Sequence, residues 1–285
     1  MNLDIWELTN YAKDNFKANE QIARFFYYWI GSNIKYDSNT LQGRKNGSIS
    51  DEEVKKNQNV FNVFNNRKGI CEGYANLFKW FMDQFDIETV VIIGYIRDER
   101  NHVLDLAKDA KFGHAWNAIK LNGKWILVDP TWGSSTNELQ AEFYFNIKPE
   151  WAIITHYPMN SKWQLLKNPL SLQEFNNSKF INPAWFYTGF SEIPKLLSDN
   201  DYYYFVYKKN QDSDWIVNLL FSNDNIHFSP IENLKSITKN GYTYCRFNKN
   251  SVPNKAFFKV NIVKYKQENH SLTSLEYSNV FSFKL

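Results

Sequence analysis

Cysteine is scarce in this chain, which holds only Cys71 and Cys245 among its 285 residues. Two cysteines cannot build a disulfide framework, and no Cys-x-x-Cys pair is present to form a zinc site. The sequence also lacks an Asp/Asn-rich calcium loop. We therefore expect no metal and no cofactor. The sequence does not exclude a disulfide between Cys71 and Cys245. Such a bond would block the Cys71 thiol, which the proposed chemistry requires to be free.

The sequence also lacks long apolar runs and a large excess of charge of one sign. The 33 basic and 30 acidic residues leave a net charge of +3 without a Lys/Arg cluster, so we expect no nucleic-acid partner. No apolar run approaches the roughly 18 residues that cross a bilayer. The N-terminus shows no basic region followed by an apolar stretch, so no secretory signal is visible. We expect a cytoplasmic protein, or a secreted or periplasmic one if a leader has been removed. The sequence predicts no oligomeric state.

The chain is rich in apolar residues, at 43%, and in aromatic residues, at 18%. This composition indicates a folded protein and not a disordered one. A composition shift marked by Asn-Pro pairs and an Asn-Asn-Ser run predicts a linker over 168–184. We therefore predict a first domain over 1–167 and a second over 185–285.

The first domain is predicted to mix helices and strands. Apolar spacing favours helix over 4–32 and 71–85, and a short helix or turn over 60–64. The polar segment 38–58 is predicted to be a surface loop, either covering a cleft or simply solvated. We predict a buried strand over 89–96, a hairpin over 113–121 and 124–130, and aromatic strands and turns over 140–166.

The second domain is predicted to be all-β. Candidate strands are separated by Asn, Asp, Gly and Ser turns and cover 201–208, 215–221, 242–247, 256–265 and 278–284. This pattern suits a sandwich of about 100 residues. The tyrosine-rich run 202–207 favours alternating core residues over a carbohydrate-binding platform.

Cys71 follows the glycine-bearing turn Arg67-Lys68-Gly69-Ile70 and opens an apolar helix. The thiolate is the nucleophilic form of cysteine, and a helix N-terminus favours it through unpaired N–H groups and a partial positive charge. The backbone N–H of Cys71 would also be free to stabilise an oxyanion. A lone cysteine is usually only a small apolar residue, so the interpretation needs partners.

The hairpin supplies those partners. Asn122-Gly123 is a strong two-residue turn, which pairs Leu121 with Lys124 and, counting back, Trp116 with Asp129. Because side chains alternate along a strand, His114 and Asp129 then share one face as diagonal neighbours. Cysteine, histidine and aspartate in this order predict a thiol nucleophile, its base and the group that orients the base. We interpret His156, in contrast, as structural, with a place in the lining of the cleft as the lesser alternative.

The segments that carry Cys71, His114 and Asp129 resemble the transglutaminase-like superfamily, and more closely bacterial relatives of kyphoscoliosis peptidase. The resemblance covers about residues 20–165. It rests on these stretches: Trp29-Ile30 with Ile34–Asp37, Lys68–Ala75, Gly113–Asn117, Gly123–Trp125 through Val128–Gly133 and, more faintly, Phe143–Phe145 and Thr155–Pro158.

The resemblance implies an α+β, papain-like catalytic domain in which a helix bearing Cys71 packs on an antiparallel sheet bearing His114 and Asp129. It implies Cys71 as nucleophile, His114 as general base and then acid, and Asp129 as orienter. Tyr36 matches the family's oxyanion-hole position, although a packed strand residue is an equal alternative, and Trp116 is placed at the oxyanion hole or cleft. The second domain resembles an immunoglobulin-like or fibronectin type III module by pattern alone.

The resemblance implies a thiol-dependent acyl-transfer enzyme acting on peptide or glutamine-type amides of a protein or peptide substrate. We favour hydrolysis, as in a cysteine peptidase or amidase, because no amine-binding feature is visible. One alternative is a protein-crosslinking transglutaminase. Another is a non-catalytic binding or scaffold protein that keeps the fold.

Overall fold

A computed structural model describes residues 3–97, 113–268 and 271–285. The chain divides into two compact units, Met1–Ser178 and Lys179–Leu285. The segment 168–184, predicted as a linker, spans this division. It contains helix α9 (Leu172–Asn177), whose Phe175 is fully buried in the first unit. Helix α10 (Ala184–Tyr187) begins at its end.

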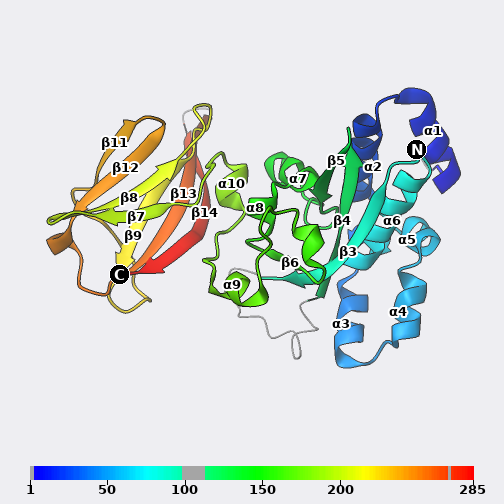
Figure 1. The fold of residues 1–285 in the computed structure, drawn as a ribbon, viewed down its shortest axis with the longest axis horizontal. Helices are drawn as coiled ribbons and strands as arrows, with labels where there is room; N and C mark the ends of the chain where they lie inside the picture. The colour runs from blue at the N-terminus through cyan, green and yellow to red at the C-terminus, as the bar shows by residue number, and fades with distance from the viewer. Residues whose placement is uncertain (1–2, 98–112, 269–270) are drawn as a thin grey trace. The chain divides into compact units, whose positions relative to one another are not determined.

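The first unit is rich in helices, most of them short (Figure 1). Besides α9 they are α1 (Ile5–Asn15), α2 (Asn19–Asn33), α3 (Ser38–Asn46), α4 (Asp51–Asn57), α5 (Val60–Asn66), α6 (Cys71–Asp83), α7 (Glu138–Phe145), α8 (Pro149–Ala152) and the 3-10 helix η2 (Ser161–Gln164). Among the described residues, none of the helices has the length and apolar character needed to cross a bilayer.

The prediction of a surface loop over 38–58 is wrong, because this segment forms α3 and α4 (Figure 1). Both helices begin at side-chain caps: Asp37 accepts from the Thr40 N–H at 3.1 Å, and Ser50 accepts from the Glu53 N–H at 3.2 Å. Such caps satisfy N–H groups that a helix leaves unpaired at its start. The polar composition concealed the helices, since few apolar residues show a helical period there.

A four-stranded antiparallel sheet in the order β5-β4-β3-β6 supports the first unit. Its strands are β3 (Thr89–Ile96), β4 (Gly113–Leu121), β5 (Lys124–Val128) and β6 (His156–Pro158). The predicted hairpin register is confirmed, with Leu121 opposite Lys124 and Asn117 opposite Val128. Helix α6 packs on β3 and β4 (Figure 1). This mixture of helix and antiparallel sheet fits the predicted α+β class.

The aromatic strands and turns predicted over 140–166 are only partly present, because β6 is the one strand in this segment and the rest of its elements are helices. The run 143–145 belongs to α7, which the Asn137 side chain caps by accepting from the Leu139 N–H at 3.1 Å. Residues 151–152 belong to α8, which has proline at its first position. Proline suits a helix start because its missing N–H would be unpaired there anyway.

The core of the first unit is aromatic. Phe26 of α2 stacks on Phe81 of α6 with ring centroids 4.0 Å apart, and both side chains are fully buried. Trp29 stacks on Phe64 at 5.1 Å, and the Arg67 guanidinium lies over both rings. These contacts fasten α2, α5 and the turn before α6 together, and they set the position at which α6 begins.

The second unit contains two four-stranded sheets, in the orders β11-β12-β8-β7 and β10-β9-β13-β14. The strands are β7 (Lys195–Ser198), β8 (Tyr202–Lys208), β9 (Ile216–Ser222), β10 (Ser229–Pro230), β11 (Lys235–Lys239), β12 (Tyr242–Asn248), β13 (Phe257–Glu268) and β14 (Ser271–Lys284), and η3 (Lys249–Ser251) follows β12. Phe247 of β12 contacts Phe258 of β13 with ring centroids 5.7 Å apart, which joins the two sheets.

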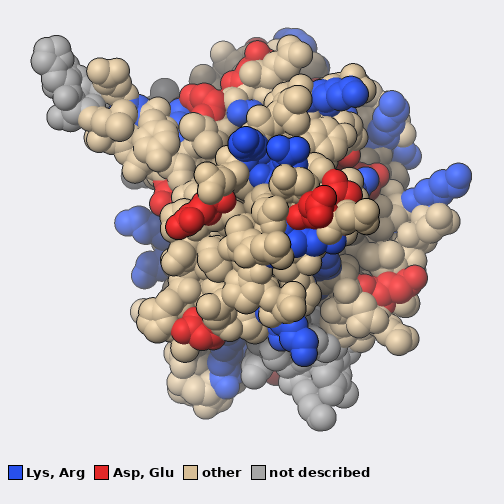
Figure 2. All heavy atoms as spheres, turned by 90° about the vertical axis from the view of Figure 1, so that its left-hand side faces the viewer, with Lys and Arg blue, Asp and Glu red and all other residues tan. Residues whose placement is uncertain are grey.

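The five predicted strands of the second unit are present, but β7, β10 and β11 were missed. All three lie at the edge of a sheet. Every residue of β11 is exposed, so no alternation of apolar and polar residues marks it as a strand. On the face that Figure 2 shows, basic and acidic side chains are interspersed, as the small net charge leads one to expect.

Candidate active site

Cys71 is the first residue of α6, as predicted from the glycine-bearing turn before it. Arg67 ends α5 in the left-handed conformation (φ 53°), and the chain then reverses through β2 (Lys68–Gly69). The buried Gln58 side chain accepts from the Ile70 N–H at 2.9 Å. A Cβ at Gly73 would collide with this Gln58 carbonyl oxygen. The glycine therefore allows Gln58 to approach and to hold the residue before Cys71.

Tyr36 lies beside this turn. It ends β1 (Lys35–Tyr36), which pairs in parallel with β2 so that Tyr36 is opposite Gly69. Its side chain is 43% exposed. Burial of the hydroxyl and the nearby Cys71 thiol raise the pKa of Tyr36 to about 12. The hydroxyl is therefore protonated at neutral pH and able to donate a hydrogen bond near Cys71.

His114 is the second residue of β4, and β4 is tied directly to the helix that carries Cys71. The fully buried Asn117 side chain donates to the Ala75 carbonyl of α6 at 3.1 Å. The His114 Nε2 lies 2.8 Å from Asp129 Oδ2, and both side chains are buried. With Nε2 used in this way, Nδ1 is the ring nitrogen left for the Cys71 thiol.

Asp129 follows the end of β5 and is fully buried. Its Oδ1 accepts from the backbone N–H groups of Thr131 at 2.8 Å and Trp132 at 3.0 Å. Its own N–H donates to the Tyr144 carbonyl at 2.8 Å. The strand therefore ends in a tight turn that points the other carboxylate oxygen, Oδ2, at His114.

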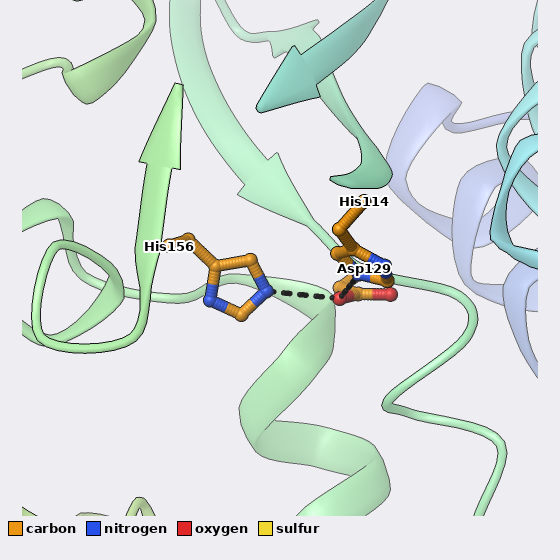
Figure 3. Close-up of side chains that lie close together, drawn as sticks. All are labelled: His114, Asp129 and His156. Carbon is orange, nitrogen blue, oxygen red and sulfur yellow. Dashed lines mark hydrogen bonds and ion pairs between the residues drawn. The ribbon is translucent and has the colours of Figure 1, made fainter. Parts of the chain in front are cut away.

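A second histidine reaches the same oxygen. His156 opens β6 and lies opposite Ile96 in the sheet. Its Nε2 is 3.1 Å from Asp129 Oδ2, and its Nδ1 is 2.8 Å from the Thr155 hydroxyl. Figure 3 shows both imidazoles directed at the Asp129 carboxylate. Sequence reasoning missed this contact.

The pKa values of the residues in this cluster shift in different directions. Burial by itself would raise the pKa of the Cys71 thiol, but a hydrogen bond and charge attraction with His114, together with the Ala115 N–H, lower it below its usual value. Although burial works against it, the Asp129 charge and hydrogen bond raise the pKa of His114 to about 10. Cys71 and His114 together therefore favour the thiolate–imidazolium form.

The other two pKa values move down. Burial would raise the pKa of Asp129, but hydrogen bonds and charge attraction from His114 and His156 hold it far below its usual range. Burial lowers the pKa of His156 and outweighs the hydrogen bond and charge of Asp129, which would raise it; the His114 charge adds to the lowering. At neutral pH, Asp129 is thus ionised and His156 is neutral.

A pocket of about 630 Å³ lies over Cys71 and His114. Apolar side chains on its wall include Leu41, Ile93 and Met159, and the charged ones are Arg44, Lys45 and Glu72. Leu41, Arg44 and Lys45 come from α3, so the segment predicted as a loop contributes a wall to the pocket as a helix.

Trp116, which we placed at the oxyanion hole or cleft, is 1% exposed. Its ring stacks on His114 with centroids 5.8 Å apart and meets His156 edge-on at 5.1 Å. Trp132 contacts the same two imidazoles at 5.7 and 4.6 Å. The two indoles therefore surround the histidines with apolar surface, which keeps water from the Asp129 contacts.

His114, Asp129 and His156 also form the cluster that a metal would favour among the described residues, since their ligand atoms lie within 4.8 Å of one another. Hydrogen bonds already account for these atoms. Each imidazole offers its Nε2 to one carboxylate oxygen, and the other oxygen is taken up by two backbone N–H groups. The donor set thus needs no cation to be satisfied.

Comparison with known proteins gives a family match that lies within the first unit and several similar proteins. Residues 7–130 match the model of the transglutaminase-like superfamily. Kyphoscoliosis peptidase of Mus musculus is 32% identical over 175 residues, which cover 59% of this chain and 25% of that protein. Hillarin of Drosophila melanogaster is 30% identical over 136 residues, covering 41% and 17%. The chain thus spans about a quarter or less of the length of these two relatives.

A solved structure described as "Crystal structure of a TGase" aligns with a TM-score of 0.36 at 15% identity. The alignment covers 47% of this chain and 32% of that one.

Proposed function

Because residues 7–130 belong to the transglutaminase-like superfamily, we propose that this chain is a thiol-dependent acyl-transfer enzyme. Its substrates are peptide or glutamine-type amides of proteins or peptides. Cys71 is the nucleophile, His114 the general base and then acid, and Asp129 the orienter of the imidazole. One observation carries the proposal. At the floor of a pocket, His114 lies between the Cys71 thiol and a buried carboxylate 2.8 Å away.

The proposed reaction begins with attack of the Cys71 thiolate on the amide carbonyl carbon. The tetrahedral intermediate collapses to a thioester as the carbon–nitrogen bond breaks, and His114 gives its proton to the leaving amine. Water or an amine then attacks the thioester, and His114 takes the proton of this second nucleophile. The carbon–sulfur bond breaks, which releases the acid or the new amide and restores the Cys71 thiolate beside the protonated His114. Asp129 stays ionised throughout and stabilises the imidazolium.

Two donors are suited to stabilise the oxyanion. The Cys71 N–H is in the first turn of α6, where backbone N–H groups have no partner within the helix. The Tyr36 hydroxyl is the second donor, since it is protonated and close to Cys71. We propose that both point at the developing negative charge.

Hydrolysis is the favoured outcome. Arg44 and Lys45 line the pocket, and the acidic residue on its wall, Glu72, lies 3.9 Å from Arg44. Because these cations line the same pocket as Cys71, they disfavour the approach of a protonated lysine side chain, whereas they do not hinder water. The name kyphoscoliosis peptidase describes a hydrolase as well. Protein crosslinking is the alternative within the same chemistry.

A non-catalytic scaffold is the alternative outside that chemistry. Cys71→Ala separates the two, because a binding protein keeps its partner while an enzyme loses turnover. For the second unit we propose an immunoglobulin-like or fibronectin type III-like sandwich. In support, its strands taken in sequence order as A to G give the sheets D-E-B-A and C′-C-F-G.

The test is the pH dependence of Cys71 alkylation by iodoacetamide, read by mass spectrometry with Cys245 as internal control. We expect reaction to persist well below the usual thiol pKa of about 8.5. Peptide hydrolysis and amine incorporation are then assayed in parallel, with and without a chelator, which should change neither. A thiol that ionises in the usual range, with no turnover of peptides, would sink the enzyme proposal.

A further inference from the structure

His156 is a fully enclosed titratable group that the mechanism above does not use. Its side chain is 2% exposed, and the titratable side chains it meets are Asp129 and His114. Trp116 and Trp132 cover it with apolar surface. A buried imidazole needs a hydrogen-bond partner at each nitrogen that carries a proton or a lone pair, and the structure supplies one for each.

The hydrogen bonds define which nitrogen of His156 carries the proton. An ionised carboxylate only accepts hydrogen bonds, so the Nε2 that lies 3.1 Å from Asp129 Oδ2 must be protonated. The Thr155 hydroxyl, 2.8 Å from Nδ1, then donates to the lone pair of that nitrogen. The alternative tautomer would place two lone pairs against each other.

Asp129 is thereby held from every side. Its Oδ2 accepts from His114 and His156, and its Oδ1 accepts from two backbone N–H groups. Without His156, the oxygen that orients His114 would keep one buried partner and gain a gap beside it. The carboxylate could then rotate about its terminal bond, and the imidazole that depends on it would follow.

We propose that His156 is a positioning residue of the Cys71–His114–Asp129 site, a neutral imidazole whose Nε2–H holds Asp129 Oδ2 toward His114. This inference rests on the proposed triad. It assigns the two histidines different tasks on one oxygen: His114 exchanges its proton during the reaction, and His156 keeps its own. The opposite pKa directions of the two imidazoles agree with that division.

The position of His156 depends on a second buried group, Arg97. Its guanidinium donates to the Ile154 carbonyl at 2.7 Å and to the Phe175 carbonyl at 3.0 Å. Its backbone N–H donates to the Thr155 carbonyl at 2.8 Å. Arg97, the residue that follows β3, thus holds the chain just before His156 in place.

Histidine-selective ¹⁵N NMR of the whole chain tests the tautomer directly, with His156→Gln used to assign the signal. We expect a neutral ring with protonated Nε2 and bare Nδ1 from pH 6 to 8. A ring protonated at Nδ1, or doubly protonated at pH 7, would overturn the proposal. This measurement requires no turnover, so it decides the role of His156 even if the chain proves not to be an enzyme.

Substitution tests the effect on Cys71. His156→Leu removes the donor, and we expect Cys71 alkylation at pH 6 to slow by about 10- to 100-fold, by analogy with the loss seen when the hydrogen-bond partners of metal-bound histidines are removed. His156→Gln can return an N–H to nearly the same place and should recover most of the rate. Tyr157→Phe, the next residue of β6, is the matched control and should leave the rate unchanged.

Equal rates for wild type, His156→Leu and His156→Gln would overturn the positioning role, and so would equal slowing in both variants. Should His156→Leu fail to fold by circular dichroism, the Gln variant and the NMR result still decide. Zinc titration adds a further arm. Binding of one zinc ion by wild type that shifts both imidazole signals and is lost in His156→Gln would mean a metal site instead.

Discussion

Each of the two units holds one cysteine, and the two thiols have opposite environments. Cys71 begins a helix, lines a pocket and has an imidazole beside it, so its pKa is lowered. Cys245 lies within β12, is 3% exposed, and burial raises its pKa. Among the described residues, its sulfur forms hydrogen bonds with the neutral hydroxyls of Tyr207 and of Ser236, whose Oγ lies 3.3 Å away. Burial acts on both thiols, so the neighbouring charge decides which one is reactive.

The two units also differ in whether the polar side chains that they bury are charged. The first unit buries His114, Asp129, His156 and Arg97, whereas the described buried polar side chains of the second are uncharged: Thr188, Ser222 and Asn261. Buried charges destabilise a fold unless each is paired and hydrogen-bonded. The first unit therefore depends on an exact polar network, and the second on apolar packing.

Asp129→Asn should produce the largest effect. The Asp129 carboxylate accepts hydrogen bonds at both oxygens, whereas the asparagine amide has one acceptor oxygen and one NH₂ group. The NH₂ group therefore faces other donors, either the imidazoles or the backbone N–H groups. We expect turnover to fall by about 10³- to 10⁴-fold and Cys71 to lose its reactivity at low pH. Cys245 in the same sample is the control. If Cys71 alkylation is unchanged, the buried Asp129 charge does not account for the difference in reactivity between Cys71 and Cys245.

The sequence predicts the parts of this network whose residues are close along the chain, and it fails for partners that are far apart along the chain. Cys71 is marked by a local turn, and the His114–Asp129 pair follows from a hairpin whose register the Asn122-Gly123 turn sets. His156 is 27 residues beyond Asp129. It arrives there only because β6 returns to pair with the far edge of β3, a tertiary event that no local pattern encodes.

The missed helices have a different cause. Helices α3 and α4 carry few apolar residues, so the period that identifies a helix was absent, although Asp37 and Ser50 were available as cap signals. The edge strands of the second unit were missed for the same reason. Sequence periodicity reports burial on one face, and these elements bury little.

Glycine substitutions compare the packing of the two units. A Cβ at Gly94 of β3 would collide with the Tyr157 carbonyl and with the Trp116 ring, beside the strand that carries His156. We expect Gly94→Ala to destabilise the first unit by about 2–3 kcal/mol. Gly241 has open space around it and a φ of 78°, so Gly241→Ala should cost the second unit only about 1 kcal/mol of backbone strain.

Hydrogen exchange followed by mass spectrometry reads both glycine variants, because it assigns the loss of protection to peptides of each unit. Equal losses of stability in the two units would contradict the tighter packing inferred around Gly94.

Acid should destabilise the first unit before the second. The folded-state pKa of His156 is lowered from its usual 6.5, so below pH 6.5 the unfolded chain binds a proton that the folded chain does not. Stability then falls as pH falls, by at most about 1.4 kcal/mol per pH unit. His114 is protonated in both states there and does not contribute. Hydrogen exchange at pH 4.5 and 6.5 measures the effect, and His156→Gln should flatten it.

The alkaline side sharpens the same comparison. The raised pKa of His114 makes stability fall as pH rises from 6.5 toward about 10, while the lowered pKa of Cys71 acts in the opposite direction. The two effects oppose each other in wild type, because the folded site favours the proton on the imidazole and not on the thiol. In Cys71→Ala only the His114 effect is left, and stability should decline by about 1–2 kcal/mol between pH 7 and 9. A flat profile in that variant would mean that His114 is not charged.

Cys245→Ala should give the smallest effect. The substitution removes one sulfur from a packed sheet and leaves the Ser236 hydroxyl without that partner, so we expect a loss of about 1 kcal/mol in the stability of the second unit. Turnover and the pH profile of Cys71 alkylation should stay within about twofold of wild type, because no charge near the pocket changes. In wild type, Cys245 should react with iodoacetamide only after denaturant opens the second unit. Reaction of Cys245 in the folded chain at neutral pH would show that burial does not protect this thiol, and it would contradict the contrast drawn between the two units.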